Sequence, residues 1–206
     1  HPADIAEILD ELTTLEGKQL FQQFNEEKAA DVLVELEEDV REQFLASLSS
    51  KEIAEQFIDN LESDDAADVI GELPEEVKEE VISHLEDVDQ ASDIVDLLNY
   101  EEGTAGALMG KEMIAVQENW TIMRCTKEMR KQAEEIDFVY TVYVVTEKDK
   151  LIGTLSLKRM LLTPVKSKIT DIYNAEVISI KATAKDEEVA QIMQKYDLIA
   201  LPVIDE

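Results

Sequence analysis

The sequence contains few cysteines, few aromatic residues and no long apolar run. Its one cysteine, Cys125, excludes an intrachain disulfide. Only 5% of the residues are aromatic, which argues against an aromatic-rich groove for a partner protein. The longest apolar runs, VYTVYVV (139–145) and LIALPVI (198–204), are far shorter than the roughly 18 residues that indicate a membrane-spanning helix.

Catalytic patterns are absent as well. We find no nucleophile paired with a base, no glycine-rich phosphate loop and no cluster of cysteine and histidine. His1 and His84 have no further ligands at metal-binding spacing. We therefore expect no enzymatic activity and no catalytic residues.

Basic residues are scarce, and their scarcity is uneven along the chain. The 206 residues include 48 acidic and 19 basic ones, for a net charge of −29. Residues 1–102 hold 32 acidic and 5 basic side chains, whereas residues 103–206 hold 16 and 14. This balance argues against a nucleic-acid partner, which needs clustered lysine and arginine, and favours cations, basic proteins or solubility alone. The sharp change predicts two domains that meet near Gly103.

The acidic half shows a recurring helical pattern of small residues, an acid and then apolar residues. Its clearest copies are PADIAEIL (2–9), AADVLVEL (29–36), AADVIGEL (66–73) and ASDIVDLL (91–98). Their apolar spacing predicts eight or so short amphipathic helices, stacked as a right-handed type of helical solenoid over residues 1–102. Ser49 and Glu52 have capping-box spacing, and Pro74 fits a first helical position. The recurring acids are unevenly spaced, so we expect a loose repeat.

The second half predicts strands and helices in alternation. A strand around MIAVQ (113–117) precedes a helix that opens near Thr121, and a second strand, a charged turn, a strand with Gly153 and another helix follow. The series begins again after residue 165, where VISIK (177–181) aligns with MIAVQ and VIDE (203–206) aligns with VVTE (144–147). We therefore predict α/β motifs at 103–165 and 166–206, the second one incomplete because its last hairpin and helix are missing.

The segment VYVVTEKDKLIGTLSLKRML (142–161) resembles a cystathionine-β-synthase (CBS) motif, so residues 103–206 resemble a tandem CBS pair. An acidic helical repeat, then EEGTAGALM (101–109), then a CBS pair resembles the cytosolic region of MgtE-family magnesium transporters. The resemblance covers nearly the whole chain and is carried by HPADIAEIL, DDAADVIGELPEEV, TAGALM and KYDLIALPVIDE.

The resemblance implies a function. In that family this region lies at the cytoplasmic face of a multi-pass membrane protein and precedes a transmembrane pore, which is absent here. It senses intracellular Mg²⁺ and holds the pore shut when Mg²⁺ is abundant. The resemblance also implies a homodimer formed through the CBS domains.

Candidate Mg²⁺ ligands follow from the same resemblance. Asp64 and Asp68 lie four residues apart, and therefore on one helical face, and they resemble the family's Mg²⁺-binding carboxylates. Mg²⁺ prefers such oxygen ligands and retains several waters. The resemblance implies counterparts at Glu187 and Asp197 in the second CBS motif. Alternatively, Asp64 only caps a helix and Asp68 is only an exposed acid of the repeat.

Further positions bear on metal and nucleotide binding. Asp93 and Asp96, three residues apart, are additional metal candidates. Lys185 stands where the resemblance implies a further carboxylate. The CBS resemblance also raises adenine-nucleotide binding, yet Lys158 and Arg159 occupy the region of the expected ribose-binding aspartate. A third reading is an acidic scaffold that binds a basic partner protein.

Overall fold

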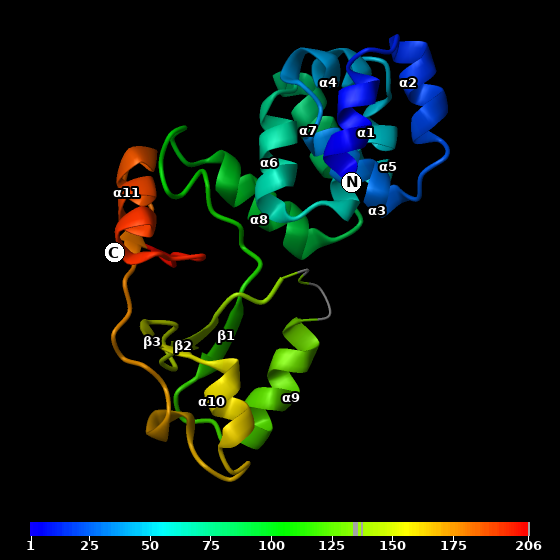
Figure 1. The fold of residues 1–206 in the computed structure, drawn as a ribbon. Helices are drawn as coiled ribbons and strands as arrows, with labels where there is room; N and C mark the ends of the chain where they lie inside the picture. Colours follow the sequence, from blue (N-terminus) through cyan, green and yellow to red (C-terminus); the bar gives the residue numbers. More distant parts are fainter. Residues whose placement is uncertain (134–135, 137, 206) are drawn as a thin grey trace. The chain divides into compact units, whose positions relative to one another are not determined.

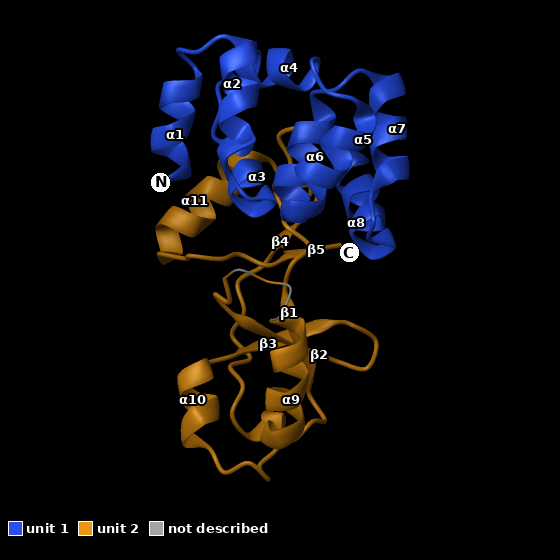
Figure 2. Cartoon of the chain, turned by 90° about the vertical axis from the view of Figure 1, so that its right-hand side faces the viewer, with its two compact units in different colours: residues 1–99 blue, residues 100–206 orange. Residues whose placement is uncertain are grey.

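The computed structural model describes residues 1–133, 136 and 138–205. The chain forms two compact units, His1–Asn99 and Tyr100–Glu206, which Figure 2 colours separately. The predicted domain boundaries after residues 102 and 165 stay predictions. Among the described residues, no helix is both long enough and apolar enough to cross a membrane.

The first unit consists of short helices joined by tight turns (Figure 1). Successive α-helices begin at a nearly constant interval, so the repeat is regular rather than loose. Ser49 and Glu52 form the predicted capping box, whereas Pro74 is the N-cap and the helix begins one residue later. The elements are α1 (Pro2–Leu9), α2 (Thr14–Phe21), α3 (Glu26–Val34), α4 (Glu38–Leu45), α5 (Ser50–Gln56), the 3₁₀ turn η1 (Ile58–Asn60), α6 (Ser63–Gly71), α7 (Glu75–His84) and α8 (Val88–Leu98).

A shared turn explains this regularity. Shortly before each new α-helix, the backbone N–H of a leucine or phenylalanine donates to the carbonyl three residues earlier, at 3.0–3.3 Å. The bond closes the last turn of the preceding segment, and the apolar side chain is buried or half-buried there. These residues are Leu12, Phe24, Leu36, Leu48, Leu61, Leu73 and Leu85. The prediction of a loose repeat relied on the unevenly spaced acids, whereas the regular period is that of these turn residues.

Aromatic rings from α2, from α4 and from the residue after α5 meet in the core of this unit. The Phe21 and Phe44 ring centroids lie 4.4 Å apart, and Phe57 meets both rings edge-on at 5.6 and 5.8 Å. All three side chains are buried. Such offset and edge-on pairs add roughly 0.5–1.5 kcal/mol each beyond their buried area.

The second unit opens with the predicted motif. Strand β1 (Ile114–Gln117) leads through α9 (Ile122–Gln132) to a parallel neighbour, β2 (Val142–Val145). Strand β3 (Leu151–Leu155) returns antiparallel to β2 and is followed by α10 (Leu157–Leu162). The inward residues of these strands are buried with Cys125 of α9.

The series then begins again, as the sequence predicts. After the 3₁₀ turn η2 (Ile169–Asp171), strand β4 (Ile180–Lys181) leads through α11 (Asp186–Tyr196) to its parallel partner β5 (Val203–Ile204). Val116 pairs with Val144 in the first motif, and Ile180 pairs with Val203 in the second. Ile180 and Val203 are the residues that align with Val116 and Val144 in the sequence, so the internal repeat is confirmed.

The two motifs exchange short segments. Residues 103–106, which lie just before the first motif, form backbone hydrogen bonds with the second motif. Residues 167–169, which lie just before the second motif, form the equivalent hydrogen bonds with the first. Four backbone bonds show the exchange: Ala105 N to Ala184 O at 2.8 Å, Ile169 N to Trp120 O at 3.0 Å, Asp186 N to Gly103 O at 3.1 Å and Ile122 N to Ser167 O at 3.0 Å. The two motifs are therefore interlocked through TAGALM (104–109) and its counterpart.

Candidate metal-binding site

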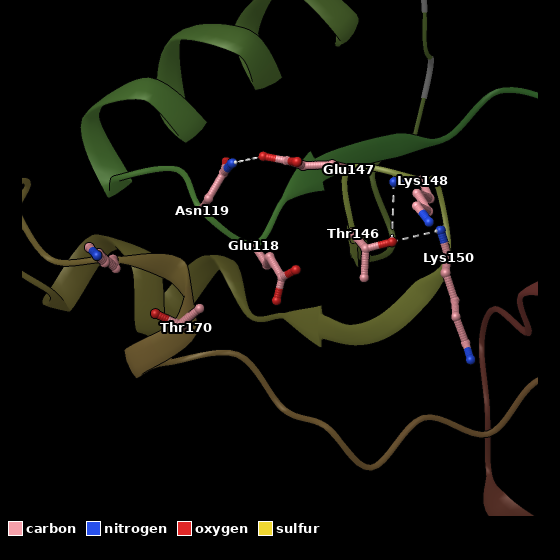
Figure 3. A pocket seen from close by; sticks show the side chains of 8 residues that line it. Glu118, Asn119, Thr146, Glu147, Lys148, Lys150 and Thr170 are labelled. Atoms are coloured by element: carbon pink, nitrogen blue, oxygen red, sulfur yellow. Dashed lines mark hydrogen bonds between the residues drawn. The ribbon is translucent and has the colours of Figure 1, made fainter.

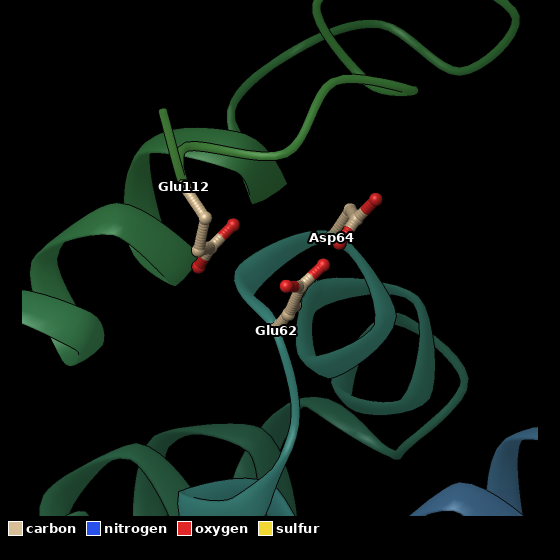
Figure 4. A group of neighbouring side chains, drawn as sticks. All are labelled: Glu62, Asp64 and Glu112. Carbon is tan, nitrogen blue, oxygen red and sulfur yellow. The ribbon is translucent and has the colours of Figure 1, made fainter. Parts of the chain in front are cut away.

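Helix α6 carries the densest group of predicted ligands. Asp64 and Asp65 lie in its first turn, and Asp68 follows one turn after Asp64. Glu62 is the N-cap, so Asp64 is the second residue of the helix and does not cap it. Figure 4 shows the side chains of Glu62 and Asp64 at this helix start. The positive end of the helix dipole favours acids here, by roughly 0.3–1 kcal/mol each.

The carboxylates of α6 disfavour one another's charge. Burial of its carboxyl, followed by the nearby charges of Asp64 and Glu72, raises the pKa of Asp68 above its ordinary value. Burial, with the charges of Asp64 and Asp68, likewise raises the pKa of Asp65. Both residues remain solvent-exposed in part, so an ion has access to them. Excess negative charge therefore gathers along one face of this helix.

Arg41 of α4 is the cation beside this face, and other groups already engage it. Its Nε donates to Glu72 Oε2 at 2.8 Å, and its Nη2 donates to Glu72 Oε1. Its Nη1 donates to the carbonyl oxygens of Val34 and Leu36, at 2.7 and 3.2 Å. The hydrogen bonds with Glu72 raise the pKa of Arg41, whereas Arg41 is the least of the influences on the pKa of Asp68. Arg41 therefore pairs with Glu72, and it lowers the pKa of Asp68 less than burial and the charges of Asp64 and Glu72 raise it.

The remaining candidates lie on two other helices. Asp93 and Asp96 both belong to α8, where Asp93 is half-buried and Asp96 is exposed. Glu187 lies in the first turn of α11, and Asp197 is the C-cap of the same helix. Ten residues of helical rise separate these two, about 15 Å. Glu187 and Asp197 of one chain therefore do not share an ion.

Two details of α11 bear on its candidates. Asp197 has φ 51°, a left-handed conformation that is uncommon outside glycine and that ends the helix. Lys185 is the N-cap, and its Nζ lies 3.1 Å from Glu101 Oε1. This ammonium supplies a fixed positive charge at a position where the resemblance implies a metal ligand.

The segment GTLSLKR shows how the expected nucleotide motif is built. Ser156 caps α10 by accepting from the backbone N–H of Arg159 at 3.5 Å, and Lys158 and Arg159 are exposed. A side chain at Gly153 would clash with the Tyr173 ring and would lie 2.5 Å from the Asn174 carbonyl oxygen. Close packing thus accounts for the glycine without any ligand.

Sequence reasoning missed three contributors to the α6 face. Asp65 follows Asp64 directly, so the DD pair was visible, but helical spacing drew attention to Asp64 and Asp68 alone. Glu72 continues the same four-residue spacing. Arg41 belongs to α4, two helices earlier, and no sequence signal linked it to Glu72.

Comparison with family models agrees with this architecture. Residues 1–103 match the model described as the MgtE intracellular N domain, and residues 105–164 match the CBS domain. Over 110 residues the chain is 37% identical to the magnesium transporter MgtE of Thermus thermophilus. It is 37% identical over 109 residues to the MgtE of Enterococcus faecalis. Each match covers 53% of this chain and 24% of the relative, so it spans about a quarter of the relative's length.

Solved structures confirm the predicted fold class. The chain superposes with a TM-score of 0.90 and 31% identity on the cytosolic domain of the Mg²⁺ channel MgtE in complex with ATP, covering 100% of this chain and 84% of that one. It also matches the soluble part of a magnesium transporter, with a TM-score of 0.86, 29% identity and coverage of 100% and 80%. These named relatives are transporters and not enzymes. With half of its residues matched by the MgtE N-domain model and a CBS motif after them, the chain belongs to the MgtE family of magnesium transporters.

Proposed function

We propose that this chain is the Mg²⁺-sensing and gating region of a magnesium transporter, located at the cytoplasmic face of the membrane. Carboxylates of the helical and CBS domains, among them Asp64, Asp68, Glu187 and Asp197, would bind Mg²⁺ between them and favour a closed state. Loss of the ion would let the domains separate and the pore open. The pore domain would belong to the same polypeptide.

The mutual repulsion of the carboxylates on α6 is the observation that carries this proposal. Protons bind to Asp65 and Asp68 more readily than to ordinary aspartates, because both carboxyls are partly buried and their charges crowd one another. A divalent cation relieves the same repulsion without a proton. Two unit charges about 4 Å apart interact by roughly 4 kcal/mol at an effective dielectric of 20, so a few such pairs are enough to bias a domain equilibrium.

The donor set suits Mg²⁺ rather than a softer metal. Asp64 and Asp68 offer carboxylate oxygens, and no imidazole or thiolate accompanies them in α6. Mg²⁺ needs only one or two such carboxylates because it retains most of its waters. Asp93 and Asp96 of α8 offer a second pair of the same kind.

Small-angle scattering over a Mg²⁺ titration tests the proposal. We expect millimolar Mg²⁺ to compact the chain, and K⁺ at matched ionic strength to do so far less. Asp64→Asn with Asp68→Asn should abolish the difference. Glu75→Gln with Glu79→Gln is a matched control, because it removes two acids four residues apart on α7. Equal compaction by Mg²⁺ and K⁺ would mean that the ions only screen the charge of the chain, which would contradict the proposal. An unaltered Mg²⁺ response in the double aspartate variant would favour binding by diffuse charge or an acidic scaffold.

Adenine-nucleotide binding is a second candidate function, supported by the relative whose structure contains ATP. Phe138 and Tyr140 also offer exposed rings, stacked with centroids 6.0 Å apart and inclined by 25°. Stacking on such a ring is worth roughly 1–3 kcal/mol for a base. Calorimetry with ATP and AMP decides the matter, and the absence of heat with both would remove this function.

A homodimer is the third part of the proposal. Apolar side chains gather on α10 and on the segments beside it, and the backbone N–H of Met123 donates to the Val165 carbonyl at 3.0 Å. We expect a second copy to cover this surface. Light scattering should show a dimer that Leu161→Glu weakens, and a monomer at all concentrations would contradict it. The exposed residues are Met123, Leu157, Leu161, Leu162 and Val165.

A further inference from the structure

The second unit contains a basic pocket that the proposed Mg²⁺ function does not use. It has a volume of about 590 Å³ and is formed by the turn after β1, the turn between β2 and β3, and the start of η2. Figure 3 shows it from close by. The lining residues are Glu118, Asn119, Thr146, Glu147, Lys148, Lys150, Lys168 and Thr170.

We propose that this pocket binds a phosphate-bearing anion through Lys148, Lys150 and Lys168. The lining residues include three lysines and two glutamates, so the lining carries a net positive charge in a chain whose net charge is −29. Among the described residues, no carboxylate lies within salt-bridge distance of these three lysines. An anion would gain its attraction to them without first displacing an internal partner.

The frame of the pocket is fixed by backbone hydrogen bonds. The N–H of Glu118 donates to the Val145 carbonyl at 3.0 Å, which joins the turn after β1 to the end of β2. The Thr146 hydroxyl accepts from the N–H groups of Lys148 and Lys150 at 3.3 and 3.2 Å, which closes the β2–β3 turn. The bond from the η2 backbone to Trp120 O anchors the start of η2. A fixed frame lowers the entropic cost of binding, because only the lysine side chains need to be ordered.

One of the two carboxylates is already held. Glu147 Oε1 accepts from Asn119 Nδ2 at 2.8 Å, and Figure 3 shows the two side chains pointing toward each other. Figure 3 draws no hydrogen bond between Glu118 and another lining side chain, and the negative charge of Glu118 opposes the binding of an anion. Removal of that charge should therefore strengthen binding, whereas removal of a lysine should weaken it.

Titration of the full chain with inorganic pyrophosphate, in Mg²⁺-free buffer with a chelator, tests the proposal by calorimetry and by Trp120 fluorescence. Trp120 is the one tryptophan, follows Asn119 directly, and bonds to both the β1 turn and η2. We expect saturable binding that each lysine-to-glutamine change weakens by about fivefold, the upper range for exposed ion pairs. Glu118→Gln should tighten binding by a similar factor. This gain in affinity distinguishes a real site from a misfolded variant.

Controls separate the possible outcomes. Lys51→Gln with Lys131→Gln and Lys195→Gln removes the same charge elsewhere and should leave binding unchanged. The absence of saturable binding, equal affinity in the Lys148, Lys150 and Lys168 triple glutamine variant, or reproduction of the signal by sodium chloride would overturn the proposal. Binding of ATP without binding of pyrophosphate would also overturn it and would support the second candidate function instead. The Mg²⁺ response by scattering is independent of all these results.

Discussion

Replacement of Asp68 by asparagine should stabilise the Mg²⁺-free protein. Asp68 lies four residues from Asp64 and four from Glu72, so two like-charge pairs disappear. Such pairs destabilise a helix by about 0.2–0.5 kcal/mol each, so the expected gain in unfolding free energy is about 0.4–1 kcal/mol. For a unit of this size that gain raises the melting temperature by about 2–8 °C. The lost attraction to Arg41 offsets part of it.

The pH dependence follows from the direction of the pKa shift. The folded chain holds a proton on Asp68 to higher pH than the unfolded chain, whose aspartate has a pKa near 3.8. The destabilising contribution of the Asp68 charge is therefore absent below a pH of about 3.8, and it develops as the pH rises through the raised pKa of the folded chain. The stability gained by Asp68→Asn over the wild type should appear in the same pH range and persist at neutral pH.

Thermal melts followed by circular dichroism measure this difference, with Glu26→Gln on α3 as the control for one lost charge, because no acid lies three or four residues from Glu26. At millimolar Mg²⁺ the wild type should gain stability by ligand binding, and the variant should gain less. The difference in melting temperature between the two should therefore shrink or change sign. A destabilised variant without Mg²⁺, or an advantage that does not change with pH, would refute charge crowding on α6.

Three further outcomes are expected. Arg41→Met should lower the unfolding free energy by about 3 kcal/mol in denaturant melts, because it leaves a half-buried Glu72 unpaired, and Glu72→Met in the same chain should recover part of the loss. Gly106→Ala should destabilise the second unit, because a Cβ there would overlap the Tyr100 ring, and Tyr100→Ala should rescue it in melts followed by fluorescence; no rescue would contradict the steric reason. Burial raises the pKa of the Cys125 thiol to about 11, so a thiol reagent at mildly alkaline pH should react only after unfolding, and rapid reaction of the folded chain would contradict that burial.

Much of the fold was predictable because it depends on local patterns. The internal repeat of the second half was read from the alignment of VISIK with MIAVQ and of VIDE with VVTE, and the strand pairs Val116–Val144 and Ile180–Val203 follow it. The capping box at Ser49 was read from spacing alone. The pairing of TAGALM with the second motif was not predicted. Backbone hydrogen bonds between residues far apart in the chain do not require a particular side-chain pattern.

The candidate site was predictable in residue type but not in its electrostatics. Helical spacing placed Asp64 and Asp68 on one face, and the structure agrees. Spacing gave no indication that Arg41, from another helix, would pair with Glu72 beside those acids. It also gave no sign that three lysines from two distant turns line one pocket.

The sequence by itself determined the division into an acidic helical half and a mixed half, and the order of their elements. These properties follow from composition and short-range periodicity, which survive without any knowledge of contacts. Only the tertiary structure decided which charges are neutralised and which are not. Charge compensation depends on distances of a few ångströms between helices and turns far apart in the chain, and Coulomb energy falls with those distances and with exposure to water.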